Sequence, residues 1–547
     1  MSAEVVLKAA LADAARDLGA PAEFEPQLER PRDAAFGDWS TNAAMNLARV
    51  LRRKPMDIAS DLVARLDVSK AGVSEAYAAA PGFINFRMAV GAEAARLASI
   101  IAAGDDYGRT SDGAGRAVNI EFVSANPTGP LHVGHGRQAA LGDAIASLLT
   151  YSGWKVTREF YYNDAGVQIA NLALSVQARV REMAGVSAPL PEGGYHGEYI
   201  RDIARQYVAA NADDAAGEAL DRIREFAVAA LRREQDLDLQ AFGVRFDVYY
   251  LESSLYSDGK VEQTVGMLER GGHTFEQDGA LWLRTTDYGD DKDRVMRKRD
   301  GTYTYFLPDV AYHVTKWQRG FASAINVQGA DHHSTVTRVR AGLQALEMGI
   351  PEGYPEYELH QMVTVMRAGE EVKISKRAGS YVTVRDLIDE VGRDAVRYFL
   401  LMRKADSPLV FDVDVARSQS DENPIYYIQM AHARLHGIFR VGEIDPASVT
   451  GHGVDWTALA SERERELVKA LLGYPALLAA ATRTRAPHLV AGYLLDLAGL
   501  VHPWYHKHHV LGEPEPVRSA RLALARAAQI VLRNGLGALG ISAPERM

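Results

Sequence analysis

The stretch AVNIEFVSANPTGPLHVGHG, residues 117–136, decides the fold class. It opens with an apolar run rich in strand-forming residues, passes through a Pro/Gly loop, and leads into a segment whose apolar residues recur at helical spacing as far as Gly153. WKVTREFYY, residues 154–162, then has the pattern of a second strand. A strand, a loop, a helix and another strand in this order predict a βαβ unit and hence a parallel sheet.

The junction between this loop and the helix suits the binding of phosphate groups. A helix N-terminus presents unpaired backbone N–H groups and the positive end of the helix dipole. His132 and His135 flank Gly134, so two imidazoles can donate to a triphosphate while the glycine lets an adenine ring approach the backbone. The GxxxxGK[ST] pattern is absent, which excludes a Walker-type cradle. Taken alone, the segment could equally be a helix start with two surface histidines.

A second segment, EEVKISKRAGS at residues 370–380, gathers Lys373, Ser375, Lys376 and Arg377 in a Gly-bounded loop. Two lysines on a loop that closes can reach the β- and γ-phosphates of a nucleotide and neutralise the charge that builds as pyrophosphate leaves. A solvated basic turn is the alternative for a KxxK pattern that stands alone.

The two segments together indicate more than either does alone. An HxGH helix start with KISKR about 240 residues later resembles the paired HIGH and KMSKS motifs of class I aminoacyl-tRNA synthetases. Further segments resemble one specificity within that class, the arginyl-tRNA synthetases: FGDWSTNAAMNLA, VNIEFVSANPTGPLHVGHGR, TYFLPDVAYH, GRDAVRYFLL, ENPIYYIQMAHARL and LGALGISAPERM. Together they extend over essentially the whole chain.

Three other functions compete with this interpretation. A different class I synthetase would share the ATP chemistry but not the amino acid. A small nucleotidyl transferase with the same helix start is usually far shorter. A non-catalytic tRNA-binding paralogue would be expected to have eroded motifs, whereas both histidines and both lysines are present in this chain.

The resemblance implies an α/β fold class with three domains. We expect an N-terminal α+β additional domain that contacts the D-loop side of tRNA, a Rossmann-like class I catalytic domain with a parallel sheet, and a C-terminal all-α bundle that binds the anticodon. The expected ranges are 1–110, then 111–380 with a mainly helical insertion around 170–240, a connecting segment at 381–420, and the bundle at 421–547. Sheet-like patterns return in ALWLRT, TYTYFLPDVAYH, SAINVQGADHH and HQMVTVM.

The same resemblance implies the residues that handle ATP. The catalytic residues would be His132, His135, Lys373 and Lys376. The ATP-binding residues would be Asn126, Pro127, Thr128, Gly129, Pro130, Leu131, His132, Val133, Gly134, His135, Gly136 and Ser375. We expect Mg²⁺ to arrive on the phosphates of ATP, with no metal held in a protein cage and no zinc.

The arginine pocket follows from the family pattern in the same way. The expected arginine-binding residues are Glu121, Ser124, Asn126, Tyr305, Asp309 and Asp331, with Gln328 and His332 as alternatives to Asp331 because NVQGADHH departs from the family's Gln–His pattern. Carboxylates and a phenol suit a guanidinium, which presents five donors in a rigid fork. A lysine would leave those acceptors unpaired, so specificity needs no editing domain.

Composition limits the remaining classes of protein. The chain of 547 residues has no cysteine, which excludes disulfide scaffolds, Cys-ligated metal centres and thiol nucleophiles. Lys and Arg number 61 against 71 Asp and Glu, a net charge of −10, so tRNA must be bound by a local basic surface. Residues 421–547 are nearly neutral. With no signal-like leader and no long apolar run, we expect a cytoplasmic protein without membrane association, and the resemblance implies a monomer.

HPWYHKHH, residues 502–509, offers one competing metal hypothesis. His502, His506 and His509 share one helical face, where they could meet a cation. We favour instead core packing for His502 and Trp504 and a tRNA-facing polar edge for the others.

Overall fold

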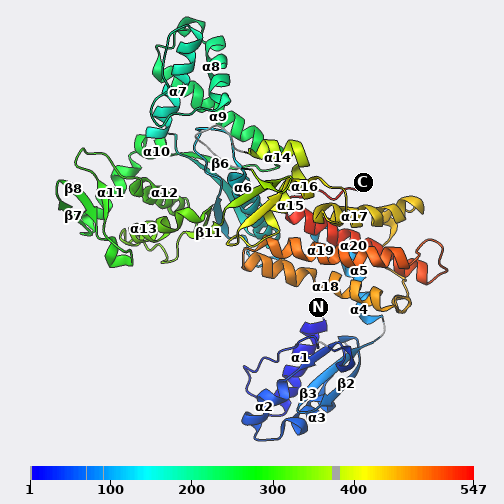
Figure 1. The fold of residues 1–547 in the computed structure, drawn as a ribbon. Helices are drawn as coiled ribbons and strands as arrows, with labels where there is room; N and C mark the ends of the chain where they lie inside the picture. Colours follow the sequence, from blue (N-terminus) through cyan, green and yellow to red (C-terminus); the bar gives the residue numbers. More distant parts are fainter. Residues whose placement is uncertain (1–2, 32, 69–70, 90, 165, 373–381) are drawn as a thin grey trace.

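The structure is a computed structural model of the chain, and it describes residues 3–31, 33–68, 71–89, 91–164, 166–372 and 382–547. The N-terminal residues build a small α+β unit (Figure 1, blue). Its elements are α1 (Ala3–Asp17), β1 (Trp39–Thr41), α2 (Ala43–Leu51), α3 (Pro55–Arg65), β2 (Val73–Ala79) and β3 (Phe83–Met88). The strands form an antiparallel sheet in the order β1-β3-β2. Leu11, Leu47 and Leu62, one from each helix, are buried with Ile84 and Phe86 of β3.

The segment after this unit packs elsewhere. Helix α4 (Ala92–Ala95) contributes Ala94, and α5 (Leu97–Ala103) contributes Leu97 and Ile100, to the large core that they share with the C-terminal helices. Two ion pairs link the N-terminal unit to this side of the molecule: Arg30 to Glu93 at 2.9 Å and Lys469 to Asp38 at 3.0 Å. The last part of the predicted range 1–110 therefore packs with the bundle.

A five-stranded parallel sheet in the order β11-β10-β4-β5-β6 forms the centre of the molecule. Its strands are β4 (Ala117–Glu121), β5 (Lys155–Tyr162), β6 (Val248–Leu251), β10 (Ser323–Gly329) and β11 (Glu356–His360). Helix α6 (Val133–Tyr151) connects β4 to β5, which confirms the predicted βαβ unit. After β4, the chain adds β5 and β6 on one side of that strand, and β10 and β11 on its other side. The switch point of the sheet therefore lies between β4 and β10. Ligands bind at such points, beyond the carboxyl ends of the strands.

Two insertions extend from this sheet. Between β5 and β6 lies the α7–α9 lobe, formed by α7 (Val167–Met183), α8 (Glu198–Ala210) and α9 (Leu220–Ala241), with a core of its own. Between β6 and β10 lie α10 (Glu252–Ser257), α11 (Lys260–Arg270), an antiparallel sheet of β7 (Thr274–Gln277), β8 (Ala280–Leu283) and β9 (Arg294–Arg297), and α12 (Phe306–Gln318); α13 (His333–Gln344) follows β10.

One secondary-structure prediction was wrong. TYTYFLPDVAYH is mostly helix α12 rather than a strand. Phe306, Val310 and Val314 recur every four residues and are buried on one face, which is the period of a helix. The segment was assigned to a strand because its aromatic and β-branched residues favour strands. Pro308 lies in the first turn, where a helix tolerates it. ALWL is β8, in the separate antiparallel sheet, whereas SAINVQG is β10 of the central sheet.

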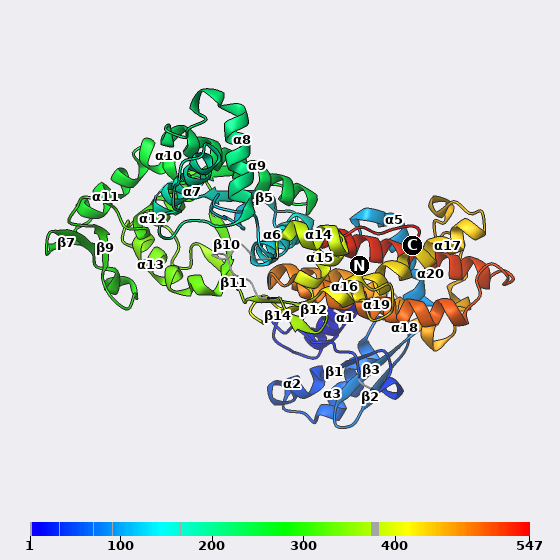
Figure 2. The same cartoon turned by 45° about the horizontal axis from the view of Figure 1, so that its top comes forward.

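The C-terminal half is mainly helical. A small sheet of β12 (Val363–Arg367), β13 (Glu370–Glu371) and β14 (Leu409–Asp412) is accompanied by α14 (Val384–Val391), α15 (Arg393–Leu401) and α16 (Val413–Arg417). The predicted bundle consists of α17 (Pro424–Val441), α18 (Glu462–Arg483), α19 (Pro487–Lys507) and α20 (Val517–Ala538). In both views the bundle and the β7–β9 sheet lie at opposite ends of the molecule, with the central sheet between them (Figures 1 and 2). No helix in the described ranges is both long and apolar enough to cross a membrane.

Candidate functional site

Helix α6 begins at the HVGH segment, where the two histidines cap it. His132 Nδ1 accepts hydrogen bonds from the backbone N–H groups of Gly134 at 3.1 Å and His135 at 3.4 Å. His135 Nδ1 in turn accepts from the His132 N–H at 3.3 Å, and the two rings stack with centroids 3.7 Å apart. Because Nδ1 is an acceptor in each ring, the neutral imidazole carries its proton on Nε2. Each Nε2–H then suits a phosphate oxygen as a donor; His135 lines the cavity described below, and contact of the two rings with phosphate stays a prediction.

The glycines of this segment allow close packing. A Cβ on Gly134 would lie 2.9 Å from His132 Cε1, and a Cβ on Gly136 would lie 3.0 Å from Val384 Cγ2. The Val384 N–H also donates to the Leu131 carbonyl at 2.8 Å, so the N-terminus of α14 lies directly on the start of α6. Gly134 thus makes room for the His132 ring, and its contact with an adenine ring stays a prediction.

A cavity of about 280 Å³ opens over the loop before α6. Asn126, Thr128, Gly129, Pro130 and His135 of the predicted ATP-binding set line it. Its other lining residues include Gln168, Tyr195 and Tyr199 of the α7–α9 lobe, which the sequence did not single out. Leu131 and Val133 are buried in the core instead.

The second predicted ATP motif cannot be placed beside this cavity. Lys373, Ser375, Lys376 and Arg377 lie outside the described residues. Their roles stay predictions of the sequence.

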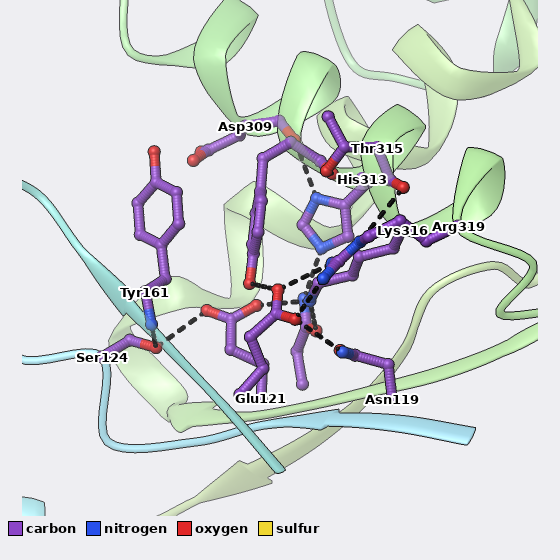
Figure 3. A network of polar contacts seen from close by, with 12 residues as sticks. Asn119, Glu121, Ser124, Tyr161, Asp309, His313, Thr315, Lys316 and Arg319 are labelled. Carbon is purple, nitrogen blue, oxygen red and sulfur yellow. Dashed lines mark hydrogen bonds and ion pairs between the residues drawn. The ribbon is translucent and has the colours of Figure 1, made fainter. Parts of the chain in front are cut away.

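The carboxyl end of β4 turns sharply toward the switch point. Val123 and Ser124 have φ values of 69° and 41°, the left-handed region that branched residues rarely adopt. The Ser124 hydroxyl donates to Glu121 Oε1 at 2.9 Å and accepts from the Tyr161 N–H at 3.2 Å, which fixes the turn (Figure 3). Strain of this kind is stored mainly at functional sites.

Beside this turn is a second cavity of about 350 Å³, which has an acidic wall. It brings together seven of the eight predicted arginine-binding residues: Glu121, Ser124, Asn126, Tyr305, Asp309, Gln328 and His332. Ser124, Asn126 and His332 also line the first cavity, so the two are contiguous. Asp331 lines neither cavity. Its side chain is 79% exposed, so Gln328 and His332 are better placed than Asp331 to contact a ligand.

Asp309 is the unusual carboxylate of this cavity. Removal from bulk water and the neighbouring charges of Glu252 and Glu121 raise its pKa to about 7, against the opposing effects of Arg338 and Lys316. A carboxylate held in this way favours a cationic partner that restores its charge balance.

Sequence reasoning missed two residues of the same wall. Glu252 is 7% exposed and accepts a hydrogen bond from Tyr161 OH at 2.8 Å, and burial raises the pKa of its carboxyl. Glu252 directly follows β6 and Tyr161 lies near the end of β5. The carboxyl ends of parallel strands meet at one edge of a sheet, and that rule would have found both residues.

A chain of buried hydrogen bonds joins Glu121 and Asp309, two residues of the cavity wall (Figure 3). Lys316 Nζ donates to Glu121 Oε2 at 2.6 Å and to Asn326 Oδ1 at 3.0 Å. Asn326 Nδ2 donates to His313 Nε2 at 2.7 Å, and so His313 carries its proton on Nδ1 and donates it to the Asp309 carbonyl at 2.7 Å. Burial lowers the pKa of His313 to about 4, which keeps the ring neutral. Both ends of this chain are predicted arginine-binding residues.

A second network of hydrogen bonds holds β5, the strand next to β4. Glu159 of β5 is fully buried and accepts from Arg319 Nη1 and Nη2, at 2.7 and 2.9 Å, from Tyr312 OH at 2.6 Å and from Asn119 Nδ2 at 3.0 Å. Burial alone would raise the pKa of Glu159, but Arg319, Lys316 and Tyr312 hold it below its usual value. The hydrogen bond from Tyr312 thereby links β5 to α12.

The histidines of α19 have partners other than a metal. His502 is 5% exposed and Trp504 is fully buried, as predicted. Arg434 Nη1 lies 2.7 Å from His502 Nδ1 and 3.3 Å from His506 Nε2, so a cationic side chain already occupies the place between them. Within the described ranges, no group of three or more His, Asp or Glu side chains is arranged to hold a metal ion.

Comparison with known proteins identifies the family of this chain. The family model of the class I (R) tRNA synthetase catalytic domain matches residues 96–417, which include both cavities. The arginyl-tRNA synthetase N-terminal domain matches residues 5–88, and the DALR anticodon-binding domain matches residues 428–547. This chain belongs to the arginyl-tRNA synthetase family.

Similarity to individual members of the arginyl-tRNA synthetase family extends over the whole length. The arginine–tRNA ligase of Thiobacillus denitrificans is 55% identical over 552 aligned residues, covering 99% of this chain and 98% of that protein. That of Geobacter metallireducens is 56% identical, covering 95% and 94%. The structure of Thermus thermophilus arginyl-tRNA synthetase superposes with a TM-score of 0.74 at 25% identity and covers both chains completely. The fold class and the enzyme class predicted from the sequence, a class I aminoacyl-tRNA synthetase, are confirmed.

Proposed function

We propose that this chain is an arginine–tRNA ligase that works through the two contiguous cavities beside α6. It activates L-arginine with ATP to arginyl-adenylate and transfers the arginyl group to the 3′-terminal ribose of tRNA(Arg), releasing pyrophosphate and then AMP. The observation that carries the proposal is the acidic cavity at the β4/β10 switch point, which adjoins a cavity lined by His135 of the histidine-capped start of α6.

Arginine is held by its two cationic ends. Asp309 and Glu252 accept from the guanidinium, whose planar fork matches paired oxygens. Tyr161 and Tyr305 border this place, and Tyr305 is 66% exposed, so it can close over the substrate. Ser124, Asn126 and His332 line both cavities. Glu121, Ser124 and Asn126, with Gln328 or His332, orient the amino acid's α-amino and carboxylate groups.

The chemical step is an in-line displacement. A carboxylate oxygen of arginine attacks the α-phosphorus of ATP, the P–O bond to the β-phosphate breaks, and pyrophosphate leaves with the electron pair. His132 and His135 donate to the phosphate oxygens, while Lys373 and Lys376, with Ser375, stabilise the departing charge. ATP is taken as its Mg²⁺ complex, with the ion as part of the substrate.

Transfer then uses the terminal ribose of tRNA. The ribose hydroxyl, the 2′-OH in this family, attacks the carbonyl carbon of the adenylate and AMP leaves. The family resemblance further implies that tRNA is bound before the adenylate forms, that residues 421–547 bind the anticodon and residues 1–110 the D-loop side, and that the enzyme is a cytoplasmic monomer.

ATP–pyrophosphate exchange tests the proposal. The assay is run with each amino acid in turn, with and without tRNA(Arg). Exchange that requires both arginine and tRNA supports it. Exchange with glutamate, glutamine or cysteine instead of arginine would refute the specificity, and no exchange with any amino acid would favour a non-catalytic tRNA-binding protein.

A further inference from the structure

The ATP loop is held from outside its own motif by a buried amide of α9. Gln235 is fully buried, and its Nε2 donates to the carbonyls of Asn126 at 3.1 Å and Gly129 at 2.8 Å. These two carbonyls lie three residues apart, at the two ends of the Pro/Gly loop. Gln235 Oε1 finds no hydrogen-bond partner among the described residues. The hydrogen bonds of this side chain therefore serve the loop.

The other two helices of the α7–α9 lobe contact the same loop. Tyr199 of α8 donates its hydroxyl hydrogen to the Thr128 carbonyl at 2.9 Å. Gln168 of α7 accepts at Oε1 from Asn126 Nδ2 at 2.7 Å. The lobe has an apolar core of its own, so these side chains project from a rigid unit.

Helix α9 also contacts α14, the helix that packs against the start of α6. Asp238, one turn after Gln235, accepts from Arg385 Nε of α14 at 2.9 Å, and Arg385 Nη2 donates to the Leu237 carbonyl at 3.0 Å. The N-terminus of α14 in turn lies on Leu131 through the Val384 N–H. Neighbouring turns of α9 thus fix both the loop before α6 and the helix packed against it.

We propose that Gln235 is a positioning residue for ATP: it sets the width of loop 126–130 so that the phosphate and adenine contacts of this segment are preformed. The inference rests on the proposed function, because that function places ATP on residues 126–136. It also makes the α7–α9 lobe part of the ATP site, although the lobe lies between β5 and β6 and outside both ATP motifs.

The variant Gln235→Met tests this role, because methionine keeps the length of the side chain and removes both donors. We expect the KM for ATP in arginine- and tRNA-dependent exchange to rise roughly tenfold, which the loss of two hydrogen bonds of ordinary strength allows. The KM for arginine should rise less than the KM for ATP, because Gly129, one of the two residues that Gln235 holds, lines only the ATP cavity, whereas Asn126 lines both. Tyr199→Phe, which keeps the ring, should raise the KM for ATP in the same direction but less. Gln240→Met is the matched control, since the Gln240 side chain is exposed on the same helix and donates to Asp236.

An ATP KM within twofold of the wild-type value in a folded Gln235→Met protein would overturn the proposal, as would an equal rise in Gln240→Met. If Gln235→Met fails to fold, Tyr199→Phe decides: an unchanged ATP KM with an unchanged melting temperature overturns it. If the wild-type enzyme itself shows no arginine-dependent exchange, the proposed function fails first. Calorimetric titration of ATP alone into wild-type, Gln235→Met and Gln240→Met proteins then decides the positioning role, with weaker binding only in Gln235→Met as the supporting result.

Discussion

Glu121 and Lys316 form a buried ion pair at the end of β4, with Lys316 Nζ 2.6 Å from Glu121 Oε2 and side-chain exposures of 6% and 0%. The ammonium also lies 4.4 Å from the centre of the Tyr312 ring. The pair joins the strained turn before the ATP loop to α12, which carries Asp309. One internal cation thus holds two substrate-facing elements together.

Removing only one partner of this pair should destabilise the protein. Lys316→Met leaves the Glu121 carboxylate buried without its counter-ion, so we expect the free energy of unfolding to fall by about 3–5 kcal/mol. The measurement is denaturant unfolding of the wild type, Lys316→Met and the double variant Glu121→Gln/Lys316→Met. The double variant should recover more than half of the loss, and a double variant no more stable than Lys316→Met would contradict this.

Asp309 should make arginine binding depend on pH. Its pKa of about 7 means that the carboxylate is increasingly protonated below neutrality, and a guanidinium binds the ionised form. The KM for arginine should therefore rise by roughly tenfold per pH unit below pH 7 and level off above it. The profile is measured by exchange from pH 5.5 to 8.5, with the KM for ATP as the internal control. A flat arginine profile would exclude Asp309 as the titrating contact.

Ionisation of Asp309, which favours arginine binding, lowers the stability of the folded protein. In the folded protein the pKa of Asp309 is raised from 3.8 to about 7, so between these values the folded state binds more protons than the unfolded state. Its contribution to the free energy of unfolding therefore falls as pH rises through this window. Asp309→Asn removes the buried charge, so it should be more stable than wild type at pH 8 while losing arginine binding. Equal stability of the two proteins at pH 8 would show that the buried carboxylate carries no such cost.

Glu252 should matter for arginine and little for ATP. Glu252→Gln keeps an oxygen for the Tyr161 hydroxyl but removes the charge that faces the guanidinium. We expect the KM for arginine to rise roughly 10- to 100-fold, the effect of losing one charge-assisted hydrogen bond. Glu262→Gln, an exposed site on α11, is the matched control. An unchanged arginine KM in Glu252→Gln would move the guanidinium elsewhere in the cavity.

The predicted role of Lys376 can be tested although the residue lies outside the described ranges. Lys376→Ala should cut turnover by roughly 10²–10³ with little change in arginine affinity, because the ammonium acts on charge that develops in the transition state. Steady-state exchange with arginine varied separates kcat from KM. Unimpaired exchange in this variant would remove Lys376 from the catalytic set.

The sequence predicted the parts of the site that lie close together along the chain. The order of strand, Pro/Gly loop and HVGH helix start was enough to place β4, α6 and the loop between them, because each depends on local pattern and backbone chemistry; phosphate binding at this junction stays a prediction. Glu252 was missed because its neighbours in the site, Tyr161 on β5 and Asp309 on α12, are distant in sequence and meet only when the sheet has formed and α12 has packed beside it. Gln235 was missed for a different reason: a glutamine inside an amphipathic helix has no local signal of the loop that it will contact.

The strand assigned to TYTYFLPDVAYH shows where local propensity fails. Aromatic and β-branched residues favour strands, but Phe306, Val310 and Val314 are spaced to bury one helical face, and packing decided the outcome. The choice between Asp331, Gln328 and His332 likewise depended on where β10 ends, which only the folded chain fixes.

The proposed function requires the acidic cavity beside α6 to bind the positive charge of a guanidinium. Citrulline tests it directly, since it has the shape of arginine and a neutral urea in place of the cation. The measurement is kcat/KM in tRNA-dependent exchange for arginine, citrulline and lysine with the wild-type enzyme. We expect the kcat/KM of citrulline and of lysine to be lower than that of arginine by a factor of about 10⁴ or more, because buried acceptors and charges would be left unpaired. Citrulline used within tenfold of arginine would contradict the account.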